Sequence, residues 1–285
     1  MNSCGILLID KPVGISSFDV IRQLRRLTGI RKFGHTGTLD PFASGLLTIL
    51  PEKTTRLAER LSAQQKEYLV TMKMGVKTAT GDTEGEVIEQ EKTDEIDAQA
   101  LPELISQVLK ITSQIPPKFS AIKIAGKRAY ELARQQEDFS LEPRPIRIHE
   151  FEIIKYTHPL LSYRALVSKG TYIRSLSETI AEMLGTIGTT IELRRTAIGD
   201  QKVTNAVKLD ELTEANWQDY LLPAEAIMPD FPRIKINDIT DFKHGRQFMV
   251  EPEEISEVMV LSETGIFLGF GQISAHILQP TMVFI

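Results

Sequence analysis

Residues 34–45 read GHTGTLDPFASG and hold the highest density of chemically informative residues in the chain. The three glycines permit tight turns, or the close approach of a ligand to the backbone. Asp40 stands between Leu39 and Pro41, so its carboxylate can lie against apolar neighbours at a loop tip. Aspartate before proline is also a common turn residue. From these residues alone, Asp40 is a candidate for catalysis or for an ordinary turn.

Regular elements are predicted on both sides of this loop. Residues 5–9 predict a short buried strand that ends before Pro12, because proline cannot continue a central ladder. Ser16 and Ser17 are candidate N-caps for a helix that runs to about Thr28, with apolar residues on one face. Residues 68–74 (YLVTMKM) predict another strand, and residues 78–85 (TATGDTEG) an acidic surface loop.

The rest of the chain alternates between helical and extended patterns. Helices are predicted over residues 94–111, 127–136 and 175–184, and residues 196–230 also read as helical and acidic, with Trp217 packed inside. Strands are predicted over 146–156 and 163–168. After residue 232 short apolar runs, such as 258–261 and 267–270, are separated by turn signals, which predicts a small β domain over 232–285.

Composition restricts the class of protein. The chain has 285 residues, of which 42% are hydrophobic and 25% charged, as in ordinary globular proteins. Cys4 is the only cysteine, so an intrachain disulfide and a cysteine-based zinc site are excluded. Apolar runs are far shorter than the roughly 20 residues that span a bilayer. We therefore expect a soluble, cytoplasmic protein.

The net charge of −5 conceals two basic regions. Residues 1–75 carry 11 basic and 6 acidic side chains, and residues 117–195 carry 13 and 9. Residues 76–116 and 196–285 are acidic, the latter with 6 basic and 14 acidic side chains. A polyanion responds to the field of the face that it meets, so a nucleic-acid ligand stays possible despite the acidic total.

A family resemblance extends this reading. The GHTGTLDPFASGLL segment resembles the catalytic motif of the bacterial tRNA pseudouridine-55 synthases, the TruB family. Six further matching segments follow the family's order over roughly residues 5–199: DKPVGISSFDV, KEYLVTMKMG with TATGDTEG, PPKFSAIKIAGKRAYELAR, RPI, SKGTYIRSL and LRRTAIG. The region after residue 232 matches the family less specifically.

The resemblance implies an α+β pseudouridine-synthase fold with a mixed, largely antiparallel sheet and flanking helices. It places a catalytic domain over residues 1–231, a thumb-like insertion within about 117–150, and a small PUA-like β domain over 232–285. The acidic charge of the last region puts in doubt the usual expectation that it binds the tRNA acceptor stem.

The implied activity is isomerisation of uridine 55, in the T loop of tRNA, to pseudouridine by base flipping. The family's catalytic aspartate falls on Asp40, which acts either as a nucleophile on the anomeric carbon or through a glycal intermediate; both routes stay open. A carboxylate suits either route, but only when ionised. Arg174 matches the arginine that pairs with this aspartate, and such a partner lowers a carboxyl pKa. Tyr68 matches the tyrosine that packs against the target uracil and is a candidate general base in the reaction.

Other positions follow from the same motifs. Tyr172 and Leu193 match walls of the uracil pocket, and Tyr172 shares a face with Arg174 if that stretch is extended. His35 matches a histidine that fills the stack vacated by the flipped base, and Asp82 its acidic partner. Lys11 is expected to support the loop of residues 34–45, which is named the catalytic loop after this resemblance. Candidates for phosphate contacts are Arg22, Arg25, Arg26, Arg31, Lys32, Lys123, Lys127, Arg128, Arg194 and Arg195.

The resemblance implies no cofactor and no metal, because the five histidines lack the spacing of a zinc motif and no nucleotide-binding loop is present. The expected partner is the tRNA T stem-loop, bound by a monomer without a protein partner or membrane. Three alternatives stay open: a non-catalytic RNA-binding or tRNA-folding module, a guide-RNA-directed synthase of the archaeal and eukaryotic type, and an aspartate-dependent glycosidase or phosphatase.

Overall fold

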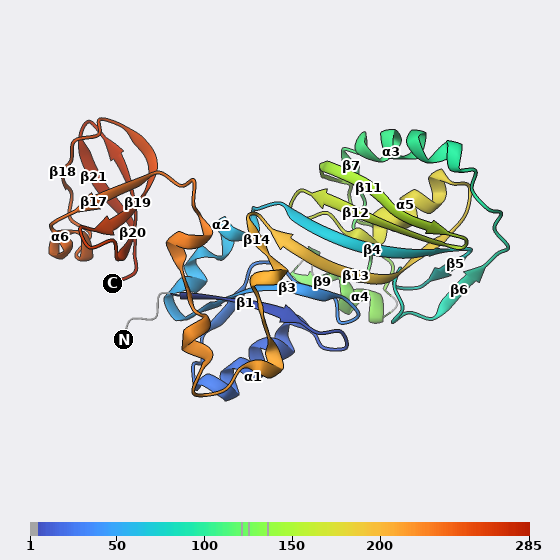
Figure 1. Ribbon diagram of the computed structural model, residues 1–285, viewed down its shortest axis with the longest axis horizontal. Helices are drawn as coiled ribbons and strands as arrows, with labels where there is room; N and C mark the ends of the chain where they lie inside the picture. Colours follow the sequence, from blue (N-terminus) through green and yellow to red (C-terminus); the bar gives the residue numbers. More distant parts are fainter. Residues whose placement is uncertain (1–4, 121, 125, 136) are drawn as a thin grey trace.

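The computed structural model describes residues 5–285 except 121, 125 and 136. Its largest element is one long mixed β-sheet (Figure 1). The strand order is β11-β12-β4-β13-β3-β1-β15. Neighbours are antiparallel except β3 with β13 and β1 with β15. The strands of this path are β1 (Gly5–Lys11), β3 (Ser44–Pro51), β4 (Lys66–Met74), β11 (Ile148–Thr157), β12 (Leu160–Val167), β13 (Gly188–Ile198) and β15 (Val207–Lys208). Attached beside it are β2 (Phe33–His35), β14 (Gln201–Lys202) and β16 (Leu222–Pro223).

Helix α1 (Ser17–Thr28) confirms the predicted first helix. Its N-cap is Ser16, whose hydroxyl accepts from the Asp19 N–H while the Asp19 carboxylate accepts from the Ser16 N–H. The helix ends at Gly29, in the left-handed conformation with φ 72°. Its buried face packs on β1 and β3 in a core that also includes Val20, Ile21, Leu24, Leu47, Ile49 and Trp217. This packing fixes the segment that precedes the catalytic loop.

Two helices cover the other half of the sheet. Helices α3 (Leu101–Leu109) and α5 (Ile173–Met183) lie on the same side of β11, β12, β4 and β13 (Figure 1). Their core contains Leu104, Val108, Leu176, Ile180, Val70, Met72, Phe151 and Tyr163. The short α2 (Ala58–Ser62) follows β3. The first turn of α5 contacts the loop of residues 34–45 through the Arg174–Asp40 ion pair.

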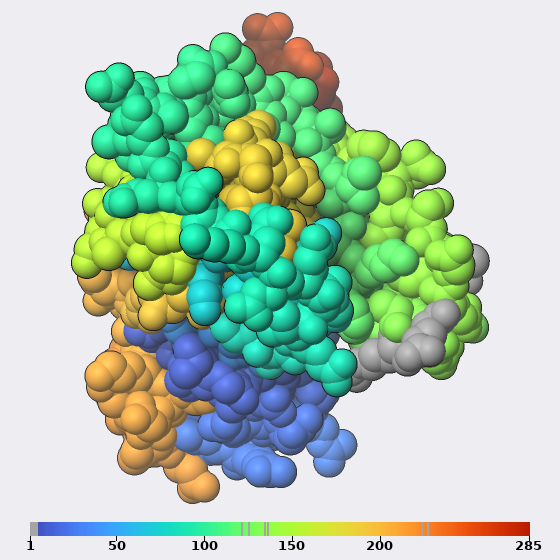
Figure 2. All heavy atoms as spheres, turned by 90° about the vertical axis from the view of Figure 1, so that its right-hand side faces the viewer, coloured from blue at the N-terminus to red at the C-terminus, as the bar shows by residue number. Residues whose placement is uncertain are grey.

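The predicted thumb-like insertion begins and ends at one point. Strand β7 (Ser113–Gln114) pairs with β10 (Arg144–Pro145), so the intervening chain leaves the domain and returns to it there. It contains β8 (Lys123–Ile124), β9 (Lys127–Arg128) and α4 (Ala129–Arg134). Figure 2 shows this yellow-green part protruding from the body, near the hairpin of β5 (Val76–Thr78) and β6 (Val87–Gln90).

The end of the chain forms a separate five-stranded sheet, as the fold class predicts (Figure 1). Its elements are β17 (Arg233–Ile236), β18 (Phe248–Met249), β19 (Ile255–Ser262), β20 (Phe267–Ser274), β21 (Ile277–Val283) and α6 (Ile239–Lys243). A shared core of Met259, Phe267, Phe270 and Phe284 with Ile6, Leu57 and Leu61 joins it to the larger part. Arg60 strengthens this junction by stacking on Phe270, with its guanidinium carbon 4.4 Å from the ring centroid, and by pairing with Glu257.

Three predicted helices need correction. Residues 196–230 contain strand ends and short 3₁₀ turns rather than a helix, because Leu209, Leu212 and Trp217 are buried as separate anchors against α1. Helix α3 begins at Leu101, not Asp94, and a single 3₁₀ turn (Ala98–Ala100) precedes it. Helix α5 begins at Ile173, so Arg174 lies in its first turn instead of in an extended segment. Within the described part of the chain, no helix has the length and apolar character needed to cross a membrane.

Candidate active site

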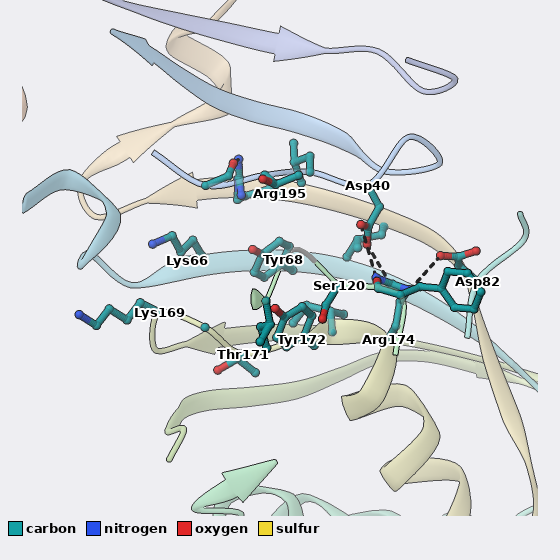
Figure 3. Close-up of a pocket in the computed structure, with 18 of the residues that line it drawn as sticks. Asp40, Lys66, Tyr68, Asp82, Ser120, Lys169, Thr171, Tyr172, Arg174 and Arg195 are labelled. Carbon is teal, nitrogen blue, oxygen red and sulfur yellow. Dashed lines mark hydrogen bonds and ion pairs between the residues drawn. The ribbon is translucent and has the colours of Figure 1, made fainter. Parts of the chain in front are cut away.

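An open pocket of about 1140 Å³ lies where the catalytic loop, β4, β13, the start of α5 and the insertion meet. Figure 3 shows Asp40, Arg174 and Asp82 at one end and Lys66 with Lys169 at the other, with tyrosines between them. The two ends thus differ in chemistry: carboxylates with an arginine at one, lysines at the other.

The catalytic loop is held by the segment that precedes α1. The Ser17 hydroxyl accepts from the Leu39 N–H (2.9 Å) and lies 3.1 Å from the Leu39 carbonyl oxygen, to which it can donate. The Gly14 N–H donates to the Pro41 carbonyl at 2.8 Å. At Gly45, with φ +107°, a Cβ atom would lie 2.2 Å from the Arg195 carbonyl oxygen, so no larger residue fits. These contacts fix the position of Asp40 before any substrate binds.

Arg174 links four segments of the site. Its Nε lies 2.9 Å from Asp40 Oδ2, and its Nη1 lies 3.4 Å from Asp82 Oδ2. Nη1 also donates to the Thr80 carbonyl at 2.6 Å, and Nη2 to the Phe119 carbonyl at 2.9 Å. Its side chain is only 5% exposed. The expected pairing of Arg174 with Asp40 is therefore present in the structure.

Asp82 has a different partner from the one expected. Besides Arg174, its carboxylate accepts from the Thr80 hydroxyl (2.5 Å) and the Glu84 N–H (3.0 Å). The His35 Nδ1 instead accepts from the Gly37 N–H at 3.3 Å. The structure thus places Asp82 against Arg174, and its expected role as the acidic partner of His35 stays a prediction.

The pKa of Asp40 is raised, whereas the arginine partner alone predicted a lowered value. Burial is the largest effect and disfavours the charged carboxylate; Arg174 opposes it, and Asp82 adds to it by like-charge repulsion. Burial likewise raises the pKa of Tyr172. The ion pair with Arg174 therefore reduces the increase in the Asp40 pKa that burial causes.

This shift predicts the acid side of the pH–rate profile. The family resemblance predicts a reaction that needs ionised Asp40, so we expect the reaction rate to fall with decreasing pH through a pKa above the ordinary aspartate value of 3.8. Single-turnover rates measured from pH 8 downward, alongside Tm at each pH, would locate this limb. A rate that is flat down to about pH 4 would contradict a raised pKa for Asp40.

Tyr68, Tyr172 and Leu193 form walls of the pocket, as expected. Tyr68 lies on β4 opposite Ala165 of β12, and only 8% of it is exposed. Tyr172 is the N-cap residue of α5, and Leu193 lies on β13 beside β4. Figure 3 shows the two tyrosines near each other in the middle of the pocket. Two rings and a leucine provide an apolar slot for a planar group.

Lys11 and Arg195 support the loop from beneath. The Lys11 Nζ donates to the carbonyls of Pro12 (2.8 Å), Ile15 (2.7 Å) and Pro41 (3.4 Å), and burial lowers its pKa to about 8. Arg195 is 1% exposed and donates to the Leu46 and Gly37 carbonyls. Arg195 also lines the pocket, but its guanidinium is occupied by these carbonyls, so its expected contact with a phosphate stays a prediction.

His35 ends β2, one residue before the pocket-lining stretch that starts at Thr36. Burial and the nearby Arg195 lower its pKa, so its ring is neutral at physiological pH. A neutral half-buried ring at this edge keeps the capacity to stack on a base. Its expected role in filling a vacated stack stays a prediction.

Several residues of the site carry no sequence signal. Lys66 lines the pocket, is 6% exposed, and has a pKa lowered to about 8 by burial, Arg195 and Lys169. The Thr80 and Phe119 carbonyls that bind Arg174 are backbone groups, which no side-chain pattern reveals. Gln114, which is hydrogen-bonded to Tyr172, lies in a segment to which the sequence motifs assign no role. Within the described residues, no cluster of three or more histidine, cysteine or acidic side chains could hold a metal ion.

Most phosphate candidates lie at the surface. Arg194 pairs with Asp10 at 2.7 Å, and Arg22 pairs with Asp19 at 2.7 Å. Arg22 and Arg25 also stack on Phe18, with guanidinium carbons 5.6 and 5.7 Å from the ring centroid. The exposed members are Arg22, Arg25, Arg26, Arg31, Lys32, Lys123, Lys127 and Arg128. Helix α1 thus carries three exposed arginines, Arg22, Arg25 and Arg26, which we call its basic ridge.

Two domain families match the chain. The N-terminal domain of the TruB family pseudouridylate synthases matches residues 25–173. The C-terminal domain of tRNA pseudouridylate synthase B matches residues 174–229.

Relatives of nearly equal length carry one name. The chain is 35% identical to tRNA pseudouridine synthase B of Clostridium tetani over 274 residues, covering 94% of this chain and 95% of the relative. It is 36% identical to the same-named protein of Aquifex aeolicus over 281 residues, covering 97% and 98%. In fold it resembles a Cbf5-Nop10-Gar1 complex structure (TM-score 0.75, 22% identity, 99% and 85% coverage) and an H/ACA RNP bound to a substrate RNA (0.74, 20%, 100% and 86%).

Proposed function

Since the chain belongs to the TruB family of pseudouridylate synthases, enzymes that isomerise uridine to pseudouridine, we propose that its target is uridine 55 in the T loop of tRNA. The observation that carries this proposal is the Asp40–Arg174 ion pair at the end of a pocket walled by Tyr68 and Tyr172.

The pocket suits a base that has left its stack. Unstacking costs a few kcal/mol, which contacts in the pocket must offset. Tyr68 and Tyr172 offer ring faces, Leu193 an apolar wall, and Arg174 stays tied to the protein rather than to solvent. His35 lies at the adjacent edge, where a ring can replace the departed base.

Asp40 acts at the ribose. The N-glycosidic bond breaks, the uracil rotates within the pocket, and a C–C bond to C5 forms. An ionised Asp40 either attacks the anomeric carbon or assists through the glycal route, and both need the negative charge that Arg174 helps to keep. Bond formation at C5 releases the C5 proton, and N1 gains a proton in exchange. Tyr68 stacks on the base, and its hydroxyl is the candidate group to relay this proton.

The basic ridge of α1 positions the RNA. Phosphate contacts orient a nucleic acid without reading its sequence. Arg25 and Arg26 are exposed on α1, whose first residue, Ser17, is hydrogen-bonded to Leu39 of the catalytic loop, so phosphates bound to this helix would orient the RNA relative to that loop.

Reversal of the ridge charges should weaken RNA binding while the fold stays intact. We expect Arg25→Glu/Arg26→Glu to raise the Kd for tRNA at least tenfold and to reduce the salt slope, since each lost phosphate contact removes about one unit of that slope. Lys92→Glu/Lys110→Glu, an equal charge change on exposed residues of an acidic segment, is the matched control. Filter binding at several salt concentrations measures both. Equal effects of the two pairs would remove α1 from the interface.

One experiment tests the function itself: purified protein is incubated with an unmodified tRNA transcript, and pseudouridine is mapped. Product at the T-loop position without added protein, guide RNA, metal or nucleotide supports a synthase that acts alone on tRNA. Modification only with a guide RNA would favour the archaeal and eukaryotic mode, and binding without product would favour an RNA-binding module.

A further inference from the structure

We infer that Gln114 is a positioning residue for catalysis, because its side chain holds the backbone of Tyr172 and with it the first turn of α5. The Gln114 Nε2 donates to the Tyr172 carbonyl at 3.0 Å. The Tyr172 N–H donates to the Gln114 Oε1 at 2.8 Å. Gln114 is 9% exposed, so these bonds have little competition from water. The inference rests on the proposed function of the pocket.

The two hydrogen bonds to the Tyr172 backbone require a neutral carboxamide at position 114. Gln114 supplies one donor and one acceptor, matched to the acceptor and the donor of one peptide residue. A glutamate there would present oxygen to the Tyr172 carbonyl, and a methionine would satisfy neither group. The two bonds therefore constrain the Tyr172 backbone as a neighbouring strand would.

Gln114 lies at the base of the insertion and connects it to the start of α5. Its strand, β7, pairs with β10 at the base of the insertion, with Gln114 opposite Arg144. From within the insertion, the Phe119 carbonyl accepts from Arg174. The insertion is thus attached to the start of α5 twice, at Tyr172 and two residues later at Arg174.

A displacement of the Tyr172 backbone would also displace Arg174, which contacts Asp40. The Tyr172 carbonyl also accepts the Leu176 N–H at 3.0 Å, which is part of the first turn of α5. Arg174, in the same turn, holds Asp40 at 2.9 Å. A misplacement of about 1 Å near a reacting centre can slow an enzyme 100-fold. Because the exposed arginines of α1 are on another element, we expect Gln114 to affect the rate more than the overall affinity for tRNA.

Gln114→Glu and Gln114→Met test this together. The first keeps size and one acceptor, and the second removes both hydrogen bonds without adding charge. Gln107→Glu and Gln107→Met, on the exposed side of α3, are the controls. Single-turnover rate and tRNA Kd are measured at a temperature at which circular dichroism shows every variant folded.

Both Gln114 variants should react at least about tenfold more slowly, with Kd within about threefold of wild type. Wild-type rates, a slow Gln114→Glu beside a normal Gln114→Met, or equal losses of rate and affinity would each overturn the inference. The first outcome removes the role, the second assigns the effect to charge, and the third to general damage. If the wild-type protein itself leaves the T-loop uridine unmodified, the proposed function fails instead.

Discussion

Asp40→Asn should reduce pseudouridine formation below detection while tRNA affinity changes less than about tenfold, or 1.4 kcal/mol. The amide keeps the shape of the side chain and can still contact Arg174, but it has no negative charge to direct at the anomeric carbon. Mapping pseudouridine in tRNA after long incubation, together with a binding titration, measures both quantities.

The same substitution should not destabilise the protein. Burial raises the pKa of Asp40 above its value in the unfolded chain, so the folded state holds the proton more tightly and stability is lost as pH rises past the unfolded value. At neutral pH the ionised group is therefore a net cost, and Tm of Asp40→Asn should equal or exceed that of wild type.

Asp241→Asn is the matched control, because Asp241 pairs with Arg246 at 2.9 Å in the C-terminal sheet, outside the pocket. It should retain full activity. Measurable turnover by Asp40→Asn would remove Asp40 from the mechanism, and a large fall in its Tm would contradict the direction of its pKa shift.

Arg174→Met should cost both activity and stability. Removal of the guanidinium leaves Asp82, whose side chain is 4% exposed, without its cation, and leaves the Thr80 and Phe119 carbonyls without this donor. Loss of one member of a buried ion pair costs about 3–5 kcal/mol. The pKa of Asp40 should rise further, because its largest opposing influence is gone.

Arg174→Lys separates charge from geometry. A lysine keeps the positive charge but cannot reach two carboxylates and two carbonyls in one plane, so we expect stability to recover more than activity. Arg164→Met is the control. Like Arg174, Arg164 pairs with more than one carboxylate, those of Glu67, Glu150 and Glu152, but it lies outside the pocket lining. Thermal unfolding and single-turnover rates distinguish the roles. Wild-type turnover by Arg174→Met would exclude Arg174 from the chemistry.

Local signals predicted the elements whose determinants are close in sequence. The Ser16 cap, the apolar face of α1 and Gly29 define that helix without help from the rest of the chain. Residues 196–230 were predicted wrongly because their apolar side chains, such as Trp217, are buried one at a time against α1. A periodic pattern cannot show that packing, since the partner lies almost 200 residues away.

Contiguous motifs in the sequence were enough for the family resemblance, which predicted the reaction class and proposed Asp40, Arg174, Tyr68 and Tyr172 as site residues. Which groups meet became visible only in the folded structure, which places Asp82 against Arg174 and buries the Arg195 side chain. It also set the direction of the pKa shift of Asp40 and brought Gln114 to Tyr172. Burial and backbone hydrogen bonds depend on every segment that packs around a group, so no local stretch of sequence encodes them.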